Sequence, residues 1–473
     1  MFDAMDDNSW NDAEMLAMRA YELYENGELK DALEQLEDAI EINPENAAWI
    51  FNAGLILDGM DQFKSAINAY QQALQITPDD PEIMNSLAVD YTRVGQYDLA
   101  IDVFEKIESI APDFEPGYCN RIITYAEMDQ HQKAEHMFYM AQQINPDCPI
   151  CFYNIGNSLF GQREYKRAIW CWQRTQQLEP THPQISYRIA QAYWADGDIA
   201  KAREHFLKEL RITPGDIDVI LDFGLFLLDC DEIDSAAEKF HRILEINPEY
   251  ARAKMYLAEI ELHRQDNDIN KAAECFLDAA EMDPTLAGPR YRLAQIAIDT
   301  DHPDRALDLL RLEMKLEIDD PDVLNSIGTM LIKLGEFDAA IDCFLRNVDS
   351  NPQNVEAFYY MGKALAIQGQ TEGAFHFFEY AMELGSEDID LYKDAIEVYC
   401  QGGQHTLAVK TLETALKIAP DDKDLHKLQT RVRSAMLSRK VKNTVNKYFL
   451  DKTRLFMGRK RTKVRQMINS KHD

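Results

Sequence analysis

Prolines recur at a fixed interval along most of this chain, and that interval constrains the fold more than any other feature. Seven of them stand 34 residues apart, at positions 44, 78, 112, 146, 180, 214 and 248. After one 36-residue step to Pro284, the 34-residue register resumes through positions 318, 352, 386 and 420, of which 352 and 420 are again proline. A sequence period of this length is typical of a solenoid, in which each repeated unit packs on its neighbours.

The twelve repeats share a pattern of small and large residues that fits a pair of packed helices. When the closing proline is position 32, the first repeat starts at Ala13 and position 20 is alanine in every repeat. Position 8 is glycine or alanine in ten repeats and position 24 is large and apolar, as in Gly54 and Tyr70. We expect the helices to approach closely at the small positions, with the large side chain filling the gap. Glycines at the turn predict a left-handed residue there, at Gly27, Gly95, Gly197, Gly335, Gly369 and Gly403.

The 408 residues from 13 to 420 resemble the tetratricopeptide repeat family, whose small-large-small pattern they match in one register. The resemblance implies an all-α fold, a right-handed superhelical solenoid of helix-turn-helix units with the first helices lining a concave groove. We expect an acidic lead-in at 1–12, twelve repeats at 13–420, a capping helix at 421–437 and a basic amphipathic tail at 438–473. The cap is expected because the last repeat would otherwise expose its apolar face.

Charge is unevenly distributed between the body of the chain and its C-terminal end. Residues 423–473 carry 16 Lys and Arg against 3 Asp and Glu, a net charge of +13, whereas residues 1–422 carry 33 against 79, a net charge of −46. An acidic body repels nucleic acid and membranes and attracts basic proteins. The cationic tail has three candidate partners, namely the protein's own acidic groove, nucleic acid and an anionic membrane. A solvated tail without a partner is the remaining interpretation.

The cysteines and the N-terminal sequence indicate a location. Most of the eight cysteines fall within expected helices at scattered positions of the repeat, which favours buried free thiols in a reducing compartment over a disulfide framework. The sequence MFDAMDDNSW is acidic and lacks an apolar run, so it does not resemble a secretory signal. The chain also lacks an apolar run of roughly 18 residues, the length of a membrane-spanning helix. These features predict a soluble, cytoplasmic protein.

We find no sequence motif that points to catalysis. Cys148 and Cys151 form a CxxC sequence without a second pair, which is weak evidence for a zinc or redox site and is typical of core or loop cysteines. Phosphate-binding glycine loops, His-Glu-x-x-His motifs and nucleophile elbows are missing, and the eleven histidines show no ligand spacing. We therefore predict that the chain is not an enzyme and that it has neither a cofactor nor a metal site.

The groove positions supply the candidate partner contacts. The resemblance implies that positions 2, 5, 6, 9, 12 and 13 of each repeat face the groove, and in repeats five and six these are rich in aromatic and amide side chains. Aromatic rings give contact area at little entropic cost, and amides hydrogen-bond a peptide backbone whatever its sequence. Position 6 carries a partial asparagine ladder, similar to that of the O-linked N-acetylglucosamine transferase family. The predicted contacts are Asn52, Asn120, Tyr153, Asn154, Asn157, Phe160, Tyr187, Arg188, Gln191, Trp194, Tyr291, Arg292, Tyr359 and Tyr360.

Alternatives stay open for these residues and for the chain. Tyrosine at position 5, asparagine at position 6 and an aromatic at position 12 are common in the family, where they also serve packing. Trp170 occupies position 22, which is usually polar, so it marks either a second contact surface or a local contact with Tyr165 or Arg167. The favoured function is a non-catalytic scaffold that binds a protein or an extended peptide. The alternatives are an adaptor that binds nucleic acid or an anionic membrane through the tail, and a regulatory subunit of a separate enzyme.

Overall fold

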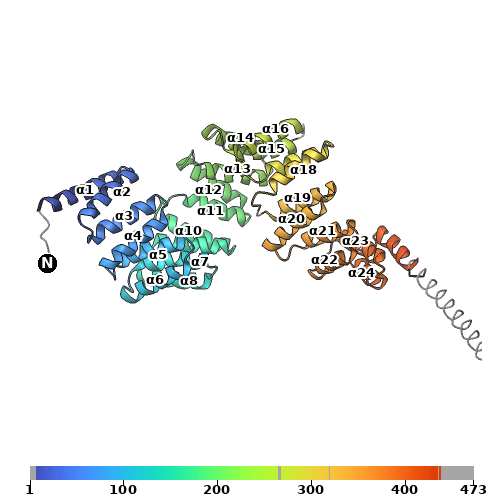
Figure 1. The fold of residues 1–473 in the computed structure, drawn as a ribbon, viewed down its shortest axis with the longest axis horizontal. Helices are drawn as coiled ribbons and strands as arrows, with labels where there is room; N and C mark the ends of the chain where they lie inside the picture. Colours follow the sequence, from blue (N-terminus) through green and yellow to red (C-terminus); the bar gives the residue numbers. More distant parts are fainter. Residues whose placement is uncertain (1–6, 265–267, 319, 435, 438–473) are drawn as a thin grey trace, which may run out of the picture. The chain divides into compact units, whose positions relative to one another are not determined.

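The structure is a computed structural model that describes residues 7–264, 268–318, 320–434 and 436–437. Within these ranges the chain is all helical, with helices α1 to α24 followed by a helix at 423–434 (Figure 1). The chain divides into two compact units, Met1–Lys239 and Phe240–Asp473. None of the described helices is both long and apolar enough to cross a lipid bilayer. The predicted all-α fold of tandem helix pairs is confirmed.

Each repeat contributes one odd-numbered and one even-numbered helix. The first helices are α1 (Asp7–Glu25), α3 (Ala47–Gly59), α5 (Pro81–Arg93), α7 (Glu115–Glu127), α9 (Pro149–Gly161), α11 (Ile185–Ala195), α13 (Ile217–Asp229), α15 (Ala251–His263), α17 (Pro289–Asp299), α19 (Pro321–Leu334), α21 (Val355–Ile367) and α23 (Ile389–Gln401). The second helices are α2 (Leu29–Ile42), α4 (Phe63–Ile76), α6 (Tyr97–Ile110), α8 (His131–Ile144), α10 (Tyr165–Leu178), α12 (Ile199–Ile212), α14 (Ile233–Ile246), α16 (Ile269–Met282), α18 (Pro303–Glu313), α20 (Phe337–Ser350), α22 (Thr371–Glu383) and α24 (His405–Ile418). Because α1 begins at Asp7, the last part of the expected lead-in is helical.

The turn between the two helices places position 15 in the left-handed region. The six predicted turn glycines all adopt it, with φ between 74° and 83°. Aspartate holds the same position in four other repeats, and Arg163 holds it in repeat five with φ of 62°. Aspartate enters this region more readily than most residues with a side chain, whereas arginine has no local hydrogen bond to offset the strain. The turn geometry is therefore set by the repeat and not by glycine alone.

The core of each repeat is built on the predicted small and large positions. All twelve alanines at position 20 are fully buried. In repeat five, Trp172 at position 24 is 1% exposed, and a Cβ atom added at Gly156 would lie 2.5 Å from its Nε1 atom. The same distance separates such an atom at Gly328 from the ring of Phe344. At Gly156 and Gly328 a small residue is thus needed, because the aromatic ring of the same repeat fills that space.

Repeats six and nine begin their first helix two residues late, at position 3 of the repeat. In both, position 27 of the repeat, which lies in the second helix, is a buried glutamate. Most other repeats have alanine or isoleucine there. The Glu209 carboxylate accepts a hydrogen bond from the backbone N–H of Tyr187 at 3.3 Å, and that of Glu313 accepts one from Gly288. These carboxylates therefore satisfy backbone donors that the first helix leaves free at its N-terminus.

A helix at 423–434 follows the twelfth repeat. Its apolar side chains Leu425, Leu428 and Val432 are buried in the same core cluster as Leu412 of α24. Asp422 begins this helix, and its Oδ1 atom accepts hydrogen bonds from two backbone N–H groups of the first turn, at 2.8 and 2.9 Å. The helix covers apolar surface that the last repeat would otherwise expose. The predicted basic tail at 438–473 lies outside the described residues.

Candidate protein-binding surface

First helices of successive repeats meet through residues that lie 35 positions apart in the sequence. Position 5 of one repeat hydrogen-bonds position 6 of the next at four places. The bonds are Asn120 Nδ2 to Asn85 Oδ1 (3.1 Å), Asn154 Nδ2 to the Cys119 carbonyl (2.9 Å), Tyr187 Oη to Asp222 Oδ2 (2.7 Å) and Tyr359 Oη to Asp394 Oδ2 (2.8 Å). Positions 5 and 6 therefore line one side of the stacked first helices, which we call the first-helix face.

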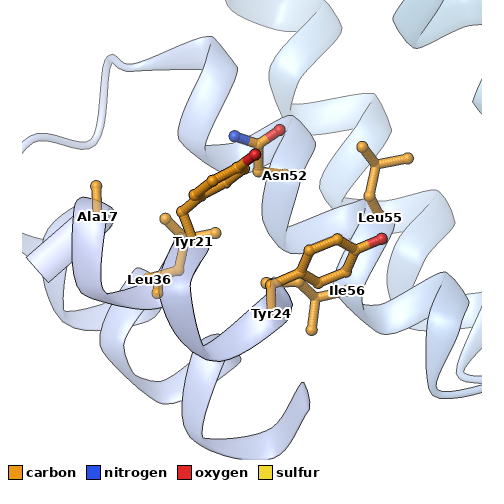
Figure 2. A pocket seen from close by; sticks show the side chains of 8 residues that line it. Ala17, Tyr21, Tyr24, Leu36, Asn52, Leu55 and Ile56 are labelled. Atoms are coloured by element: carbon orange, nitrogen blue, oxygen red, sulfur yellow. The ribbon is translucent and has the colours of Figure 1, made fainter. Parts of the chain in front are cut away.

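A pocket opens on this face at the N-terminal end of the described chain. Its cavity volume is about 210 Å³, and Figure 2 shows that its side chains come from α1, α2 and α3. Tyr21 and Tyr24, at positions 9 and 12 of the first repeat, remain 64% and 43% exposed. The exposed amide of Asn52 lies at position 6 of the second repeat. The N-terminal pocket is lined by Ala17, Ala20, Tyr21, Tyr24, Leu36, Asn52, Leu55 and Ile56.

A second group of predicted contacts lies in repeats five and six. Asn157 is exposed, and Tyr153 is half-buried with its ring centroid 4.5 Å from that of His182. Phe160 is also half-buried and its ring contacts that of Trp172. Asn154 differs, because it is 4% exposed and its amide already bonds the backbone of the preceding repeat. Its side chain therefore joins two repeats and offers little surface to a partner.

Carboxylates of repeat seven complete this second group. Asp222 Oδ2 accepts hydrogen bonds from Tyr187 Oη and from Gln191 Nε2, at 2.7 and 2.8 Å. Asp229 Oδ2 accepts one from Trp194 Nε1 at 2.9 Å. Burial, followed by the hydrogen bond to Asp222, raises the pKa of Tyr187 above its usual value. The tyrosine therefore stays a neutral hydrogen-bond donor to Asp222.

The Phe240–Asp473 unit repeats this arrangement. Tyr359 Oη donates to Asp394 Oδ2, and the Lys363 ammonium lies 3.0 Å from the same oxygen. Tyr360 is half-buried and stacks on Phe344 with ring centroids 5.7 Å apart. The remaining predicted contacts, Tyr291 and Arg292, lie on α17. Tyr291 is 9% exposed, and Arg292 Nε lies 2.6 Å from Glu259 Oε1.

Two family models, both described as tetratricopeptide repeat, match the chain. One matches residues 23–83 and 365–432, and the other matches residues 153–217, 221–287 and 327–389. Together these segments span more than half of the chain. The chain belongs to the tetratricopeptide repeat family. The resemblance inferred from the small and large positions is therefore confirmed.

Curated tetratricopeptide-repeat relatives match only part of the chain. A segment of 235 residues is 22% identical to Protein CTR9 homolog of Arabidopsis thaliana and covers 48% of this chain and 22% of that protein. A segment of 131 residues is 27% identical to human Tetratricopeptide repeat protein 7A and covers 28% of this chain and 15% of that protein. The chain thus spans less than a quarter of the length of either relative.

Several solved structures are also similar to the chain, at low identity and low TM-score. Yeast Tom70 is 16% identical, with a TM-score of 0.45 over 88% of this chain and 98% of that one. Cut9–Hcn1, of an APC/C hetero-tetramer, is 14% identical with a TM-score of 0.40 over 89% and 96%. YrrB, a tetratricopeptide-repeat protein with an unusual peptide-binding site, is 24% identical with a TM-score of 0.35 over 43% and 99%. All three TM-scores are below 0.5, so these structures do not indicate what this chain binds.

Several residues of the first-helix face escaped the sequence prediction. Tyr21 and Tyr24 occupy groove positions of the first tetratricopeptide repeat, so applying the position rule to that repeat would have found them. Asp222 and Asp394 both stand at position 6, where each accepts a hydrogen bond from the tyrosine of the preceding repeat. A tyrosine at position 5 with an aspartate 35 residues later is the signal that would have identified them.

A buried carboxylate lies between repeats two and three. Asp90 is 1% exposed, its Oδ1 atom lies 3.2 Å from Arg93 Nη1, and the same guanidinium pairs with Asp58. The Oδ2 atom of Asp90 is buried without a hydrogen-bond partner. Burial, together with the nearby charge of Asp58, raises the pKa of Asp90 to about 7, although Arg93 acts against the shift. This carboxyl group therefore gains and loses its proton near neutral pH.

Two cysteines correct the expectation of free thiols. Cys119 of α7 and Cys151 of α9 form a disulfide. The other six cysteines are free: Cys148, Cys171, Cys230, Cys275, Cys343 and Cys400. The prediction is wrong for this pair because it considered each cysteine within its own repeat. Position 5 of repeat four faces position 3 of repeat five, since the first helices of successive repeats pack side by side.

Trp170 lies on the second-helix side of the tetratricopeptide repeats. Its side chain is 59% exposed, and its ring meets that of Phe152 edge-on at 5.7 Å. It lines a shallow cavity of about 380 Å³ together with Tyr139 and Arg167. Trp170 therefore makes a local ring contact, with Phe152, and still presents a large apolar surface to solvent.

Proposed function

We propose that this chain is a non-catalytic scaffold that binds an extended segment of a partner protein along its first-helix face. Tetratricopeptide repeats generally mediate protein–protein interactions, and the family is the coarse basis for the proposal. The observation that carries it further is the N-terminal pocket, where Tyr21 and Tyr24 remain 64% and 43% exposed beside an apolar floor. Large apolar rings around a concave pocket are typical of ligand sites.

The residues of the N-terminal pocket suit a peptide side chain and its backbone. Leu36, Leu55 and Ile56 supply an apolar floor for an aliphatic or aromatic side chain. The two tyrosine rings would cover that side chain from above, with hydroxyl groups left to bond solvent or the peptide. Asn52 carries both a donor and an acceptor, which matches the N–H and C=O of an extended backbone. The pocket thus favours an extended peptide with one apolar anchor.

Charge on the first-helix face favours a basic segment. Asp222 is half-buried and Asp229 is exposed, and both lie next to predicted contact residues. The 1–422 part of the chain carries a net charge of −46. Such a field accelerates encounter with a positively charged partner and weakens as salt screens it. We therefore propose a partner segment with Lys or Arg flanking the apolar anchor.

Binding of synthetic peptides tests this function. An array of 12-residue peptides that vary one apolar anchor and its flanking charges would be screened with the intact chain, and the tightest sequence taken to calorimetry. The double change Tyr21→Ala and Tyr24→Ala should weaken that peptide at least tenfold, since exposed aromatic anchors dominate such contacts. The matched control is Tyr139→Ala, which removes a 55% exposed tyrosine from α8 on the second-helix side.

Two outcomes would contradict the proposal. If the double alanine variant and the intact chain bind the selected peptide equally well, the N-terminal pocket is not the contact site. If affinity is instead lost when residues 438–473 are removed, and the intact chain retains DNA or anionic vesicles more tightly than any peptide, the adaptor function replaces the scaffold. Unchanged peptide affinity after that truncation supports the first-helix face.

A further inference from the structure

Four potential metal ligands converge where α7 packs on α9. Glu115 and Cys119 lie one turn apart on the same side of α7, whereas Cys148 precedes α9 and Cys151 lies in its first turn. Their ligand atoms all lie within 4.8 Å of one another. The three cysteines are between 1% and 4% exposed, and Glu115 is half-buried. Apart from the Cys119 backbone carbonyl, which accepts a hydrogen bond from Asn154, this thiol–carboxylate cluster takes no part in the first-helix contacts of the proposed function.

Three of the separations within the thiol–carboxylate cluster are close to those of a tetrahedral metal site. Cys119 Sγ lies 3.6 Å from Cys148 Sγ and 3.4 Å from Glu115 Oε1, and Cys151 Sγ lies 3.7 Å from the same carboxylate oxygen. Zinc–sulfur bonds of about 2.3 Å and zinc–oxygen bonds of about 2.0 Å in tetrahedral geometry place ligand atoms roughly 3.5 to 3.8 Å apart. The packing of α7 on α9 therefore brings the four ligand groups together, and Cys119 and Cys151 can both bind a metal once their disulfide is reduced.

Neighbouring groups orient these ligands. The backbone N–H of Cys151 donates to Cys148 Sγ at 3.1 Å, and both residues lie at the N-terminus of α9. Asn145 Nδ2 donates to Glu115 Oε2 at 3.1 Å, which leaves Oε1 directed at the sulfurs. Such outer contacts are typical of sites that hold a metal ion in fixed geometry.

We propose that Glu115, Cys119, Cys148 and Cys151 bind one Zn²⁺ ion when the Cys119–Cys151 disulfide is reduced. A dithiol reductant supplies two electrons and two protons: the disulfide bond breaks, two protein thiols form, and the dithiol closes to its own disulfide. Zn²⁺ then displaces three thiol protons into solvent and forms three Zn–S bonds, while Glu115 supplies a carboxylate oxygen. Three thiolates with one carboxylate favour zinc over magnesium or calcium.

Two consequences follow from the shared sulfurs. The metal and the disulfide exclude each other, because both use Cys119 and Cys151. The disulfide and the metal ion each link repeat four to repeat five, so the two repeats stay cross-linked in oxidising and in reducing conditions. Zinc affinity should fall at acid pH, since each thiol must lose its proton before it binds.

The test uses the full chain and Co²⁺, whose absorption reports thiolate ligation, followed by Zn²⁺ displacement. The chain is reduced with excess dithiol, separated from the dithiol under anaerobic conditions, and titrated with Co²⁺. We expect about one Co²⁺ per chain with a thiolate charge-transfer band, complete displacement by Zn²⁺, and a zinc-dependent rise in the unfolding temperature. The unreduced chain should bind at least tenfold more weakly.

Variants separate this site from adventitious binding. Cys148→Ser leaves the disulfide pair intact, so the chain can be folded and purified oxidised before it is reduced, and it should then lose Co²⁺ affinity at least tenfold. Glu115→Gln should weaken binding while keeping the thiolate band. Cys171→Ser, which alters a buried free cysteine of α10, should bind as the unmodified chain does. Failure of the reduced chain to bind Co²⁺, or equal losses in Cys148→Ser and Cys171→Ser, would overturn the proposal.

Discussion

Trp172 of α10 occupies the space that a side chain at Gly156 of α9 would need. An alanine Cβ at Gly156 would lie 2.5 Å from the indole Nε1 atom, and Trp172 is 1% exposed, so the ring has no free space to enter. Overpacking of this kind costs about 1 to 3 kcal/mol. The ring and the backbone of α9 thus set each other's position.

Gly156→Ala should therefore lower the stability of the chain. We expect a lower urea midpoint in circular dichroism, equivalent to a loss of about 2 kcal/mol. Gly161→Ala is the matched control in the same helix, because a Cβ there meets nothing within 4 Å. That variant should be neutral or slightly more stable, since alanine favours helix over glycine. Equal destabilisation by both changes would contradict the packing account.

Asp90 gives the chain a pH-dependent stability. Its pKa is raised to about 7 in the folded state by burial and then by Asp58, against an ordinary value of 3.8. Between these two values the folded chain holds a proton that the unfolded chain has lost, so unfolding releases it. Stability from this group is therefore present at low pH and is lost as the pH rises through about 7.

Asp90→Asn should remove that pH dependence. Relative to the variant, the unmodified chain should lose about 2 kcal/mol of stability between roughly pH 5 and pH 8. Thermal or urea unfolding at both pH values measures the difference. Asp98→Asn alters an exposed aspartate of α6 and should follow the unmodified chain at both pH values. A constant difference between the unmodified chain and Asp90→Asn at both pH values would rule out the assigned titration.

At the scale of the element, the N-terminus of α11 depends on a side chain from α12. Glu209 is 3% exposed, and its carboxylate accepts hydrogen bonds from the backbone N–H groups of Tyr187 and Ser186. Alanine at this position would leave two buried donors unpaired and open a cavity. Each of these effects costs about 1 to 3 kcal/mol.

Glu209→Ala should accordingly destabilise the chain by about 3 kcal/mol and expose the start of α11. Hydrogen exchange is the direct measurement, because the amides of Ser186 and Tyr187 should lose protection before those of α9. Glu204→Ala on the exposed side of the same helix should change neither stability nor exchange. Protection of both amides that survives the loss of Glu209 would show that another group satisfies them.

The helix pairs could be predicted from the sequence because nearly the same pattern of small and large residues recurs in all twelve repeats. Alanine at position 20, a small residue at position 8 and a large apolar residue at position 24 predict a close helix pair, and Gly156 and Trp172 pack in this way. The turn at position 15 was predictable where glycine occupies it. Arg163 keeps the left-handed turn without glycine, because the two helices it joins fix its backbone.

The site residues were less predictable because they combine positions from different repeats. Cys119 and Cys151 are 32 residues apart, and they meet only because α7 packs beside α9. In the sequence Asp222 is one of many acidic residues, but in the structure its carboxylate accepts a hydrogen bond from Tyr187 of the preceding repeat. Contacts of this kind require the offset between neighbouring first helices, which the repeat period alone does not give.

For the whole molecule, charge and shape favour the same kind of partner. Under the proposed function, the net charge of −46 on residues 1–422 would attract basic segments, and the N-terminal pocket would hold the apolar anchor of the peptide among exposed tyrosines. Association with a basic peptide should slow as salt rises, because screening weakens long-range steering. Dissociation should depend mainly on the apolar anchor, which salt affects little.

The most direct measurement of the central claim is photo-crosslinking of the selected basic peptide to the intact chain. A photoreactive phenylalanine derivative would replace Leu55 in the N-terminal pocket or, as the control, Leu99, which is 47% exposed on α6. We predict efficient crosslinking from position 55 that unlabelled peptide competes away, and little from position 99. Equal or greater crosslinking from position 99, or a yield at position 55 that competitor does not reduce, would contradict binding along the first-helix face.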